Sequence, residues 1–251
     1  VADLNSGRTG LGGAGVDNTS GLVFGGATPG GRSALVESWN GSSWTEVADL
    51  SVERDNPGGA GIITAALAFG GKQNPTVDEV PKTESWNGSA WTDLADMNTA
   101  RQAFASMGTQ TAALAAGGNP STGITETWDG NIWTETSNLN QERSFLSGSR
   151  SGTTTAGLIA GGNMPPGQQA LTEQYNGTSW AEVNNLNTAR YGLMMRGVQT
   201  SALAAGGWEG SRSAKTESWN GYVWTEVNDL NTGRSDTTGA GVSNTSALIT
   251  A

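Results

Sequence analysis

The charged side chains that could carry chemistry recur at a fixed spacing in this sequence of 251 residues. A glutamate stands two positions before an aromatic residue in each of five repeats, and an arginine follows that aromatic by 15 positions. Recurring carboxylates and guanidinium groups can form one ion pair per repeat, which we expect to tie each repeat to the next, or the arginines can form a ring that binds an anion. The glutamates are Glu37, Glu84, Glu126, Glu173 and Glu217, and the arginines are Arg54, Arg101, Arg143, Arg190 and Arg234, with a further copy at Arg8.

The composition argues against catalysis. Histidine and cysteine are both absent, so the chain offers no Ser-His-Asp set, no thiolate and no imidazole metal ligand. The acidic residues follow the repeat, so none forms the single carboxyl pair, about 5–10 Å apart, that glycoside hydrolysis requires. We therefore expect a protein that is not an enzyme, with no cofactor and no bound metal.

Charge and hydropathy exclude further classes of function. The net charge is −10, which repels phosphate backbones and disfavours nucleic-acid binding. No apolar run approaches the roughly 18 residues of a membrane-spanning helix, so we expect no membrane insertion.

The repeated segment predicts an all-β fold. Its first aromatics lie about 45 residues apart, a period typical of propeller blades. In the second repeat, a strand of small residues (a) and an apolar strand (b) ending at Gly70-Gly71 precede two strands (c and d) joined by Asn87-Gly88, a pair that favours a tight hairpin turn. We thus predict four-stranded antiparallel blades with five c–d hairpins, at about 37–47, 84–94, 126–136, 173–183 and 217–227.

A second aromatic closes each hairpin, five residues after the first. Each ring can bury about 150–250 Å², and we expect these rings to pack between neighbouring blades. The alternative is a ring of platforms on which carbohydrate stacks. The second aromatics are Trp44, Trp91, Trp133, Trp180 and Trp224.

With these features in place, the chain resembles the kelch repeat over essentially its whole length. The double glycine, the aromatic, the second tryptophan and the following arginine carry this resemblance, most closely in Trp91-Thr-Asp-Leu-Ala-Asp-Met-Asn-Thr-Ala-Arg101. The hairpin between the two aromatics is tighter than in most kelch repeats. Its Trp-Asn-Gly core is similar to repeats of viral and environmental bacterial proteins, which implies a virion or cell-surface setting.

The two ends of the sequence bear on the number of blades. Residues 1–25 and 227–251 are copies of the same half-repeat, so the chain holds six a–b strand pairs and five c–d hairpins. We expect a single propeller domain over 1–251 with six blades, one of them incomplete, whose missing hairpin is supplied by flanking sequence or another chain. The alternative is five blades with a surplus or swapped a–b pair.

The b–c loops differ in length between repeats, and in a meander they emerge on the same face as the d–a loops. Variable loops on a repeated scaffold favour a binding role for this face. Trp208 is the one tryptophan outside the repeat pattern, and its ring either contacts a partner or covers its own blade. We predict a non-catalytic extracellular or virion-surface module that binds a protein partner, or alternatively a glycan. The candidate contact residues are Trp208, Glu209, Arg212, Lys72, Gln73, Asn119 and Met164.

Overall fold

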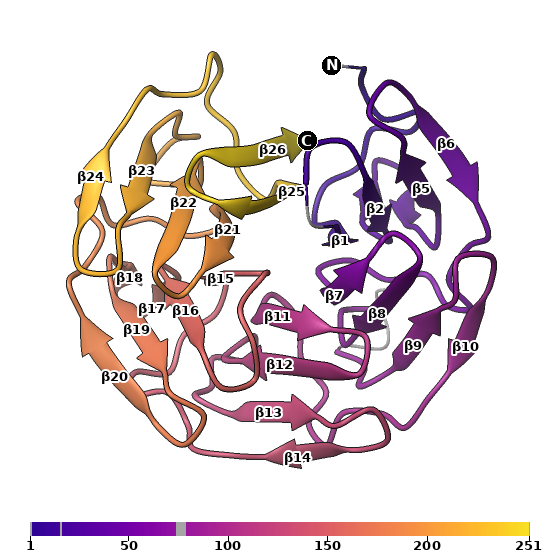
Figure 1. Cartoon of the computed structure of the whole chain (residues 1–251), viewed down its shortest axis with the longest axis horizontal. Helices are drawn as coiled ribbons and strands as arrows, with labels where there is room; N and C mark the ends of the chain where they lie inside the picture. The colour runs from indigo at the N-terminus through magenta and orange to yellow at the C-terminus, as the bar shows by residue number, and fades with distance from the viewer. Residues whose placement is uncertain (1, 16, 74–78, 251) are drawn as a thin grey trace.

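The computed structural model is a disc of antiparallel sheets arranged around a central axis (Figure 1), and it describes residues 2–15, 17–73 and 79–250. Five of the sheets have four strands each, and in these the strand order from the axis outward follows chain order a-b-c-d. Within the described residues, no helix is long and apolar enough to cross a membrane. The all-β propeller predicted from the sequence is confirmed.

Five blades are complete. Blade 1 holds β1 (Gly12–Ala14), β2 (Gly21–Phe24), β5 (Val36–Trp39) and β6 (Trp44–Val47). Blade 2 holds β7 (Gly58–Ile62), β8 (Ala65–Phe69), β9 (Thr83–Trp86) and β10 (Trp91–Asp93). Blade 3 holds β11 (Ala105–Thr109), β12 (Ala112–Ala116), β13 (Thr125–Trp128) and β14 (Trp133–Glu135). Blade 4 holds β15 (Ser147–Gly148), β16 (Gly157–Ala160), β19 (Thr172–Tyr175) and β20 (Trp180–Val183). Blade 5 holds β21 (Met194–Val198), β22 (Ser201–Ala205), β23 (Thr216–Trp219) and β24 (Trp224–Glu226).

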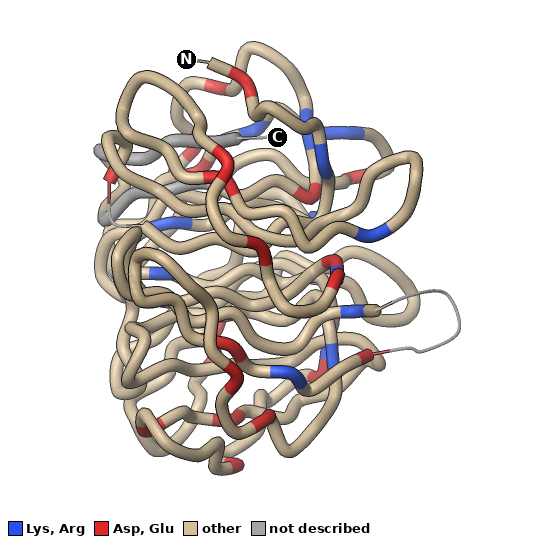
Figure 2. The backbone as a smooth tube through the Cα atoms, turned by 90° about the vertical axis from the view of Figure 1, so that its right-hand side faces the viewer, with Lys and Arg blue, Asp and Glu red and all other residues tan. Residues whose placement is uncertain are grey.

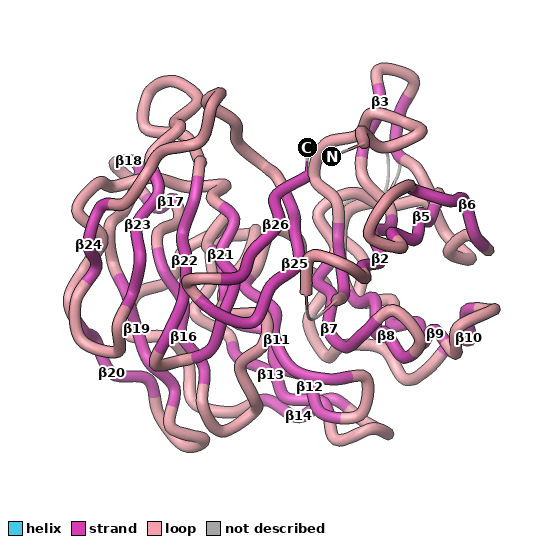
Figure 3. The backbone as a smooth tube through the Cα atoms, turned by 45° about the horizontal axis from the view of Figure 1, so that its top comes forward, coloured by secondary structure: helices cyan, strands magenta, loops and turns pink. Residues whose placement is uncertain are grey.

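A sixth sheet contains only β25 (Thr238–Ser243) and β26 (Ser246–Thr250). It lies between blade 5 and blade 1 and packs β25 against β21 and β1 (Figure 3). The structure therefore matches the alternative expectation of five blades with a surplus strand pair, which packs within the ring of its own chain. It occupies a sixth position in the ring with two strands in place of four.

Backbone hydrogen bonds close the ring around the axis. The residue two positions after each repeated arginine has a left-handed conformation, with φ between 50° and 65°. Its N–H donates to the carbonyl oxygen of the equivalent residue in the preceding position, over 2.7–3.3 Å, and the circle includes the loop that leads into β25. The six members are Gly10, Asn56, Ala103, Phe145, Gly192 and Asp236. The surplus pair is thus part of the closed ring.

Small residues in strand a let the blades meet closely at the axis. A Cβ on Gly59 of β7 would lie 2.4 Å from the carbonyl oxygen of Gly13 in β1. That distance is far inside van der Waals contact, so the approach of these two strands requires glycine.

The aromatic pairs pack between blades. The two rings of each hairpin lie side by side, with centroids 4.9–5.5 Å apart. The second ring reaches the preceding blade: Trp133 Nε1 donates to Thr83 Oγ1 at 3.0 Å, and Trp180 Nε1 donates to Thr125 Oγ1 at 3.0 Å. In blade 1 a valine, Val36, replaces this threonine, and Trp91 donates instead to the carbonyl of Ala48. These rings are consequently part of the core between blades.

The repeated arginine joins two blades through both its backbone and its side chain. The carbonyl of Arg101 accepts a hydrogen bond from Gly71 in blade 2, whereas its guanidinium pairs with Glu126 in blade 3 at 3.0 Å. Both side chains are fully buried. Glu126 also accepts from the backbone N–H of Asn98 at 2.7 Å, so its two oxygens are both satisfied. The same ion pair occurs as Arg8–Glu37, Arg54–Glu84, Arg143–Glu173 and Arg190–Glu217.

The fold yields a first prediction: Glu126→Gln should lower the free energy of unfolding by about 3–5 kcal/mol, because it leaves a buried guanidinium without its counter-charge. Asp93→Asn is the matched control, since Asp93 pairs with Lys82 at 2.6 Å but is 58% exposed. The control should cost about 1 kcal/mol or less. Urea unfolding followed by tryptophan fluorescence measures both, and equal losses would contradict a structural role for the buried pair.

Candidate functional site

The b–c and d–a loops come together on one face of the disc. Two b–c loops contain short ribbons, β3 (Ala27–Thr28) with β4 (Gly31–Arg32) and β17 (Asn163–Met164) with β18 (Gly167–Gln168). Each b–c loop also pairs with the d–a loop beside it through an isolated β-bridge. These bridges are Thr9–Ala27, Asp55–Lys72, Gln102–Asn119, Ser144–Asn163 and Tyr191–Trp208.

In the edge-on view, most Lys and Arg positions lie towards the side of the disc that carries these loops, whereas Asp and Glu are more evenly spread (Figure 2). Five of these arginines are buried in ion pairs with glutamates, so they do not add positive charge to the surface of this face. Arg32 in the blade 1 loop donates from Nε to Asp55 Oδ1 at 2.9 Å and so links two neighbouring loops by an ion pair.

Three of the candidate residues lie together on the blade 5 loop. Trp208 is 36% exposed and forms backbone bridges with Tyr191 and Arg212. Glu209 accepts hydrogen bonds from Lys215 at 2.9 Å and Ser213 at 3.1 Å. The hydrogen bond from Lys215 is the main cause that lowers the pKa of Glu209. Glu209 therefore shapes the loop, while Trp208 is exposed at its surface.

The other candidates lie on separate blades. Asn119 and Gln102 both donate to Glu79 Oε1, at 2.9 and 3.0 Å, and this contact links the loops of blades 2 and 3. Partial burial opposes ionisation of Glu79, but hydrogen bonds outweigh it and lower the pKa. Lys72 forms β-bridges to Asp55 and Glu79, and Gln73 follows it directly. Met164 is on β17, one blade further round, and belongs to neither group.

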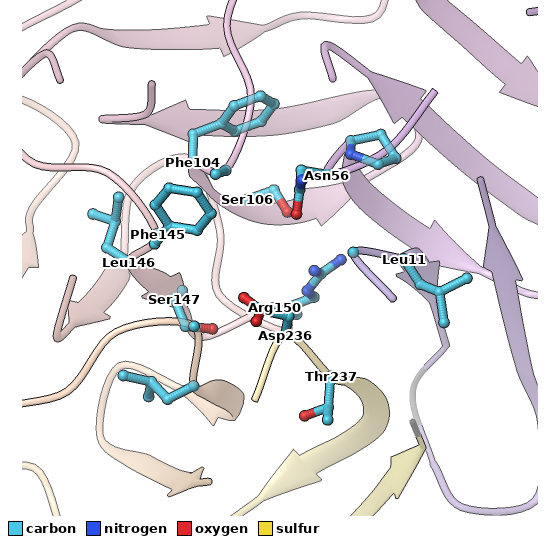
Figure 4. A pocket seen from close by; sticks show the side chains of 16 residues that line it. Leu11, Asn56, Phe104, Ser106, Phe145, Leu146, Ser147, Arg150, Asp236 and Thr237 are labelled. Carbon is cyan, nitrogen blue, oxygen red and sulfur yellow. The ribbon is translucent and has the colours of Figure 1, made fainter. Parts of the chain in front are cut away.

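A pocket of about 440 Å³ opens at the centre of this face. Residues of the d–a loops line it, among them Asn56, Tyr191 and Asp236, and Arg212 is the candidate residue that reaches it. It continues towards the axis into a second space, past Asn56, Phe145 and Asp236, into which Arg150 extends (Figure 4). The site is therefore a central pocket bordered by loops that carry exposed contact residues.

Sequence reasoning assigned no role to the pocket residues of the d–a loops. One feature of the sequence could have indicated these pocket residues. The residue two positions after each repeated arginine varies between Gly, Asn, Ala, Phe and Asp in an otherwise regular repeat. The repeated arginines, by contrast, do not reach this pocket. The five that precede complete blades are buried in ion pairs, so these five guanidinium groups form no open anion-binding ring.

Asp236 is a partly buried carboxylate that borders the pocket. Burial raises its pKa, partly offset by a hydrogen bond from Ser235 and by the charge of Arg212. It lines both the outer pocket and the inner space. Within the described residues, no three acidic side chains gather as a metal site would require.

No protein-family model matches the chain, and no curated protein matches it. The structure shows a propeller of five four-stranded blades, while the kelch resemblance stays a prediction from the sequence.

The raised pKa of Asp236 gives a second prediction, for Asp236→Asn. The unfolded chain ionises this group first, so its contribution to stability falls as pH rises from 3.8 through the folded-state pKa. The asparagine variant lacks this loss, and its stability relative to the wild type should increase over that range. Urea unfolding at several pH values measures the difference.

Asp129→Asn is the matched control, because four other hairpins already have asparagine at this turn position. The backbone N–H groups of Ile132 and Asn131 donate to Asp129 and lower its pKa, so its pH trend should have the opposite sign. A difference between Asp236→Asn and wild type that stays constant from pH 3 to pH 7 would contradict the prediction.

Proposed function

We propose that this protein is a non-catalytic binding module that contacts a protein partner through its b–c and d–a loop face. The observation that carries the proposal is the gathering of non-repeated residues on this face, with the exposed ring of Trp208 beside the central pocket. Tryptophan and arginine are the residues that most often dominate the energy of protein interfaces. Trp208 and Arg212 are thus the proposed centre of the contact.

The opposite face supports this choice, because its c–d turns are nearly alike. In each turn an Asn or Asp side chain accepts hydrogen bonds from the backbone N–H groups of the residues two and three positions later, as Asn87 does from Ser89 and Ala90. The hydrogen-bonding groups of these turns are thus paired within the turn, and their side chains vary little between blades. Blades 3 and 5 are exceptions, since Ile132 at the blade 3 turn is 55% exposed and Tyr222 at the blade 5 turn is 79% exposed.

Binding is proposed rather than catalysis because of the groups in the pocket. Its carboxylates are Asp55, which is held by Arg32 at 2.9 Å, and Asp236, whose pKa burial raises. No histidine or cysteine exists to act with them. The proposed setting, a virion or cell surface, rests on the repeat resemblance alone.

A glycan is the second candidate ligand. An exposed indole next to a pocket lined by Asn56, Tyr191 and Asp55 has the aromatic and polar groups that sugars use. A glycan array separates the two: recognition of one sugar that Trp208→Ala abolishes supports the lectin, and silence supports a protein partner.

The third prediction concerns Trp208. A photo-crosslinking residue placed at position 208 should capture a partner protein from the native source, whereas the same residue at position 222 should not. With the purified partner, Trp208→Ala should raise the dissociation constant measured by calorimetry by at least about tenfold, because a buried interface tryptophan contributes roughly 2 kcal/mol or more to the binding free energy.

Tyr222→Ala is the control for this experiment, since it removes an exposed aromatic from the opposite face. Its affinity should stay within about twofold of the wild type. If Tyr222→Ala weakens binding and Trp208→Ala does not, the partner binds the opposite face and the proposal fails.

A further inference from the structure

Two arginines outside the repeat, Arg150 and Arg196, lie on strand a segments next to the axis. Counting from the repeated arginine of each repeat, Arg196 stands at a position held by alanine, methionine or serine elsewhere, and Arg150 stands at a position held by glycine in every other copy. Arg196 is on β21 of blade 5, and Arg150 follows β15 of blade 4. Adjacent blades therefore each place one guanidinium where the other repeats have an uncharged residue.

Neither arginine has a carboxylate partner in the part of the chain that the structure describes. Arg196 is 1% exposed, its Nη2 donates to Thr238 Oγ1 at 3.0 Å, and its Nε has no hydrogen-bond partner. Arg150 Nη1 donates to the carbonyl of Gly13 at 2.9 Å. The five ion-paired arginines of the repeat differ because each has its own glutamate. Four of them also have one buried guanidinium nitrogen without a partner, so the missing carboxylate, and not the unpartnered nitrogen, distinguishes Arg196 from them.

The two guanidinium groups are close enough to repel each other. Burial, and then the charge of Arg150, lower the pKa of Arg196 well below its usual value, and burial lowers the pKa of Arg150 to about 10. Arginine stays protonated in proteins even when buried, so two uncompensated positive charges share the axis. Burying such charges without a counter-ion is costly, and an anion between them removes that cost.

A small space lies between these side chains. It borders Arg150 and Arg196 and is otherwise lined by backbone and methyl groups of β1 and β7, including Gly13, Ala60 and Gly61. Its volume of about 10 Å³ is the space of roughly one water molecule, so a halide ion, which is somewhat larger, fits only when the flexible side chains of Arg150 and Arg196 move slightly apart. Arg150 also lines the wider inner space, and its guanidinium extends between Asn56 and Thr237 there (Figure 4), which joins the site to the loop-face pocket.

We propose that Arg150 and Arg196 form an axial binding site for a halide-sized inorganic anion. Arg196 supplies its unpartnered Nε–H from the buried side, and Arg150 supplies its guanidinium from the side of the pocket. Asp236 is the carboxylate on the route, and it is not ion-paired to either arginine. Its negative charge opposes an entering anion, so it sets the affinity without contributing a ligand.

The fourth prediction tests this site with chloride and bromide on the full chain. Chloride is exchanged for gluconate at constant ionic strength, and broadening of the ³⁵Cl resonance gives the dissociation constant. The wild type should bind saturably, and crystals soaked in bromide should show an anomalous peak between the guanidinium groups of Arg150 and Arg196. Arg196→Met should weaken chloride binding by at least tenfold, whereas Asp236→Asn should strengthen it.

Arg32→Met is the matched control, because it removes a guanidinium from the loop face that already has a carboxylate partner. It should change chloride affinity by less than twofold. In gluconate alone, Arg196→Met should be at least as resistant to urea as the wild type, since it removes an uncompensated charge. If Arg196 had a purely structural role, Arg196→Met would instead be less resistant to urea than the wild type.

Three results would overturn the proposal: no bromide peak in the wild type, unchanged chloride affinity in Arg196→Met, or competition by phosphate as strong as that by bromide. If Arg196→Met does not fold, the proposal is tested by the bromide map of the wild type and by the chloride affinity of Asp236→Asn. A peak at the guanidinium pair together with tighter binding in Asp236→Asn supports the site, and absence of either overturns it.

Discussion

The buried arginine–glutamate pair is the interaction on which the rest of this propeller depends. A blade of small, glycine-rich strands cannot bury enough surface to be stable alone, so its stability comes from its neighbours. Arg101 supplies this link in one residue, because its carbonyl holds the double glycine of blade 2 and its guanidinium holds Glu126 of blade 3. The interval from the first aromatic to this arginine is therefore the same in every repeat.

The same arginine explains how the loops can vary without loss of the fold. Arg101 Nη1 donates to the carbonyls of Gly117 and Ile124, which are the two ends of the b–c loop in blade 3. Arg190 holds Gly206 and Lys215 in the same way in blade 5. Because the arginine holds both ends of the loop in place, the segment between them can vary in length and in residue type. Trp208 lies in such a segment.

The sequence predicted what the repeat controls and missed what depends on closure of the ring. The Asn-Gly turns and aromatic pairs are local signals, so strands such as β9 and β10 could be placed by spacing alone. The central pocket is formed by Asn56, Tyr191 and Asp236, which come from different repeats and meet only across the axis. The contact from Arg150 to Gly13 likewise spans 137 residues. The number of complete blades could not be chosen either, since two strands suffice to fill the sixth position.

The repeat distinguishes the arginines that have a structural role in this protein from Arg150 and Arg196, which do not recur. Where a repeated arginine precedes a complete blade, the repeat supplies a glutamate with it, and the two charges compensate each other; Arg234, which precedes the two-stranded sheet, has no such glutamate among the described residues. Arg150 and Arg196 arise where the repeat is broken, so no partner came with them, in a protein whose net charge is otherwise −10. A buried cation that persists against its own desolvation cost implies a compensating group. Here that group must come from outside the repeat, and the small axial cavity borders both Arg150 and Arg196.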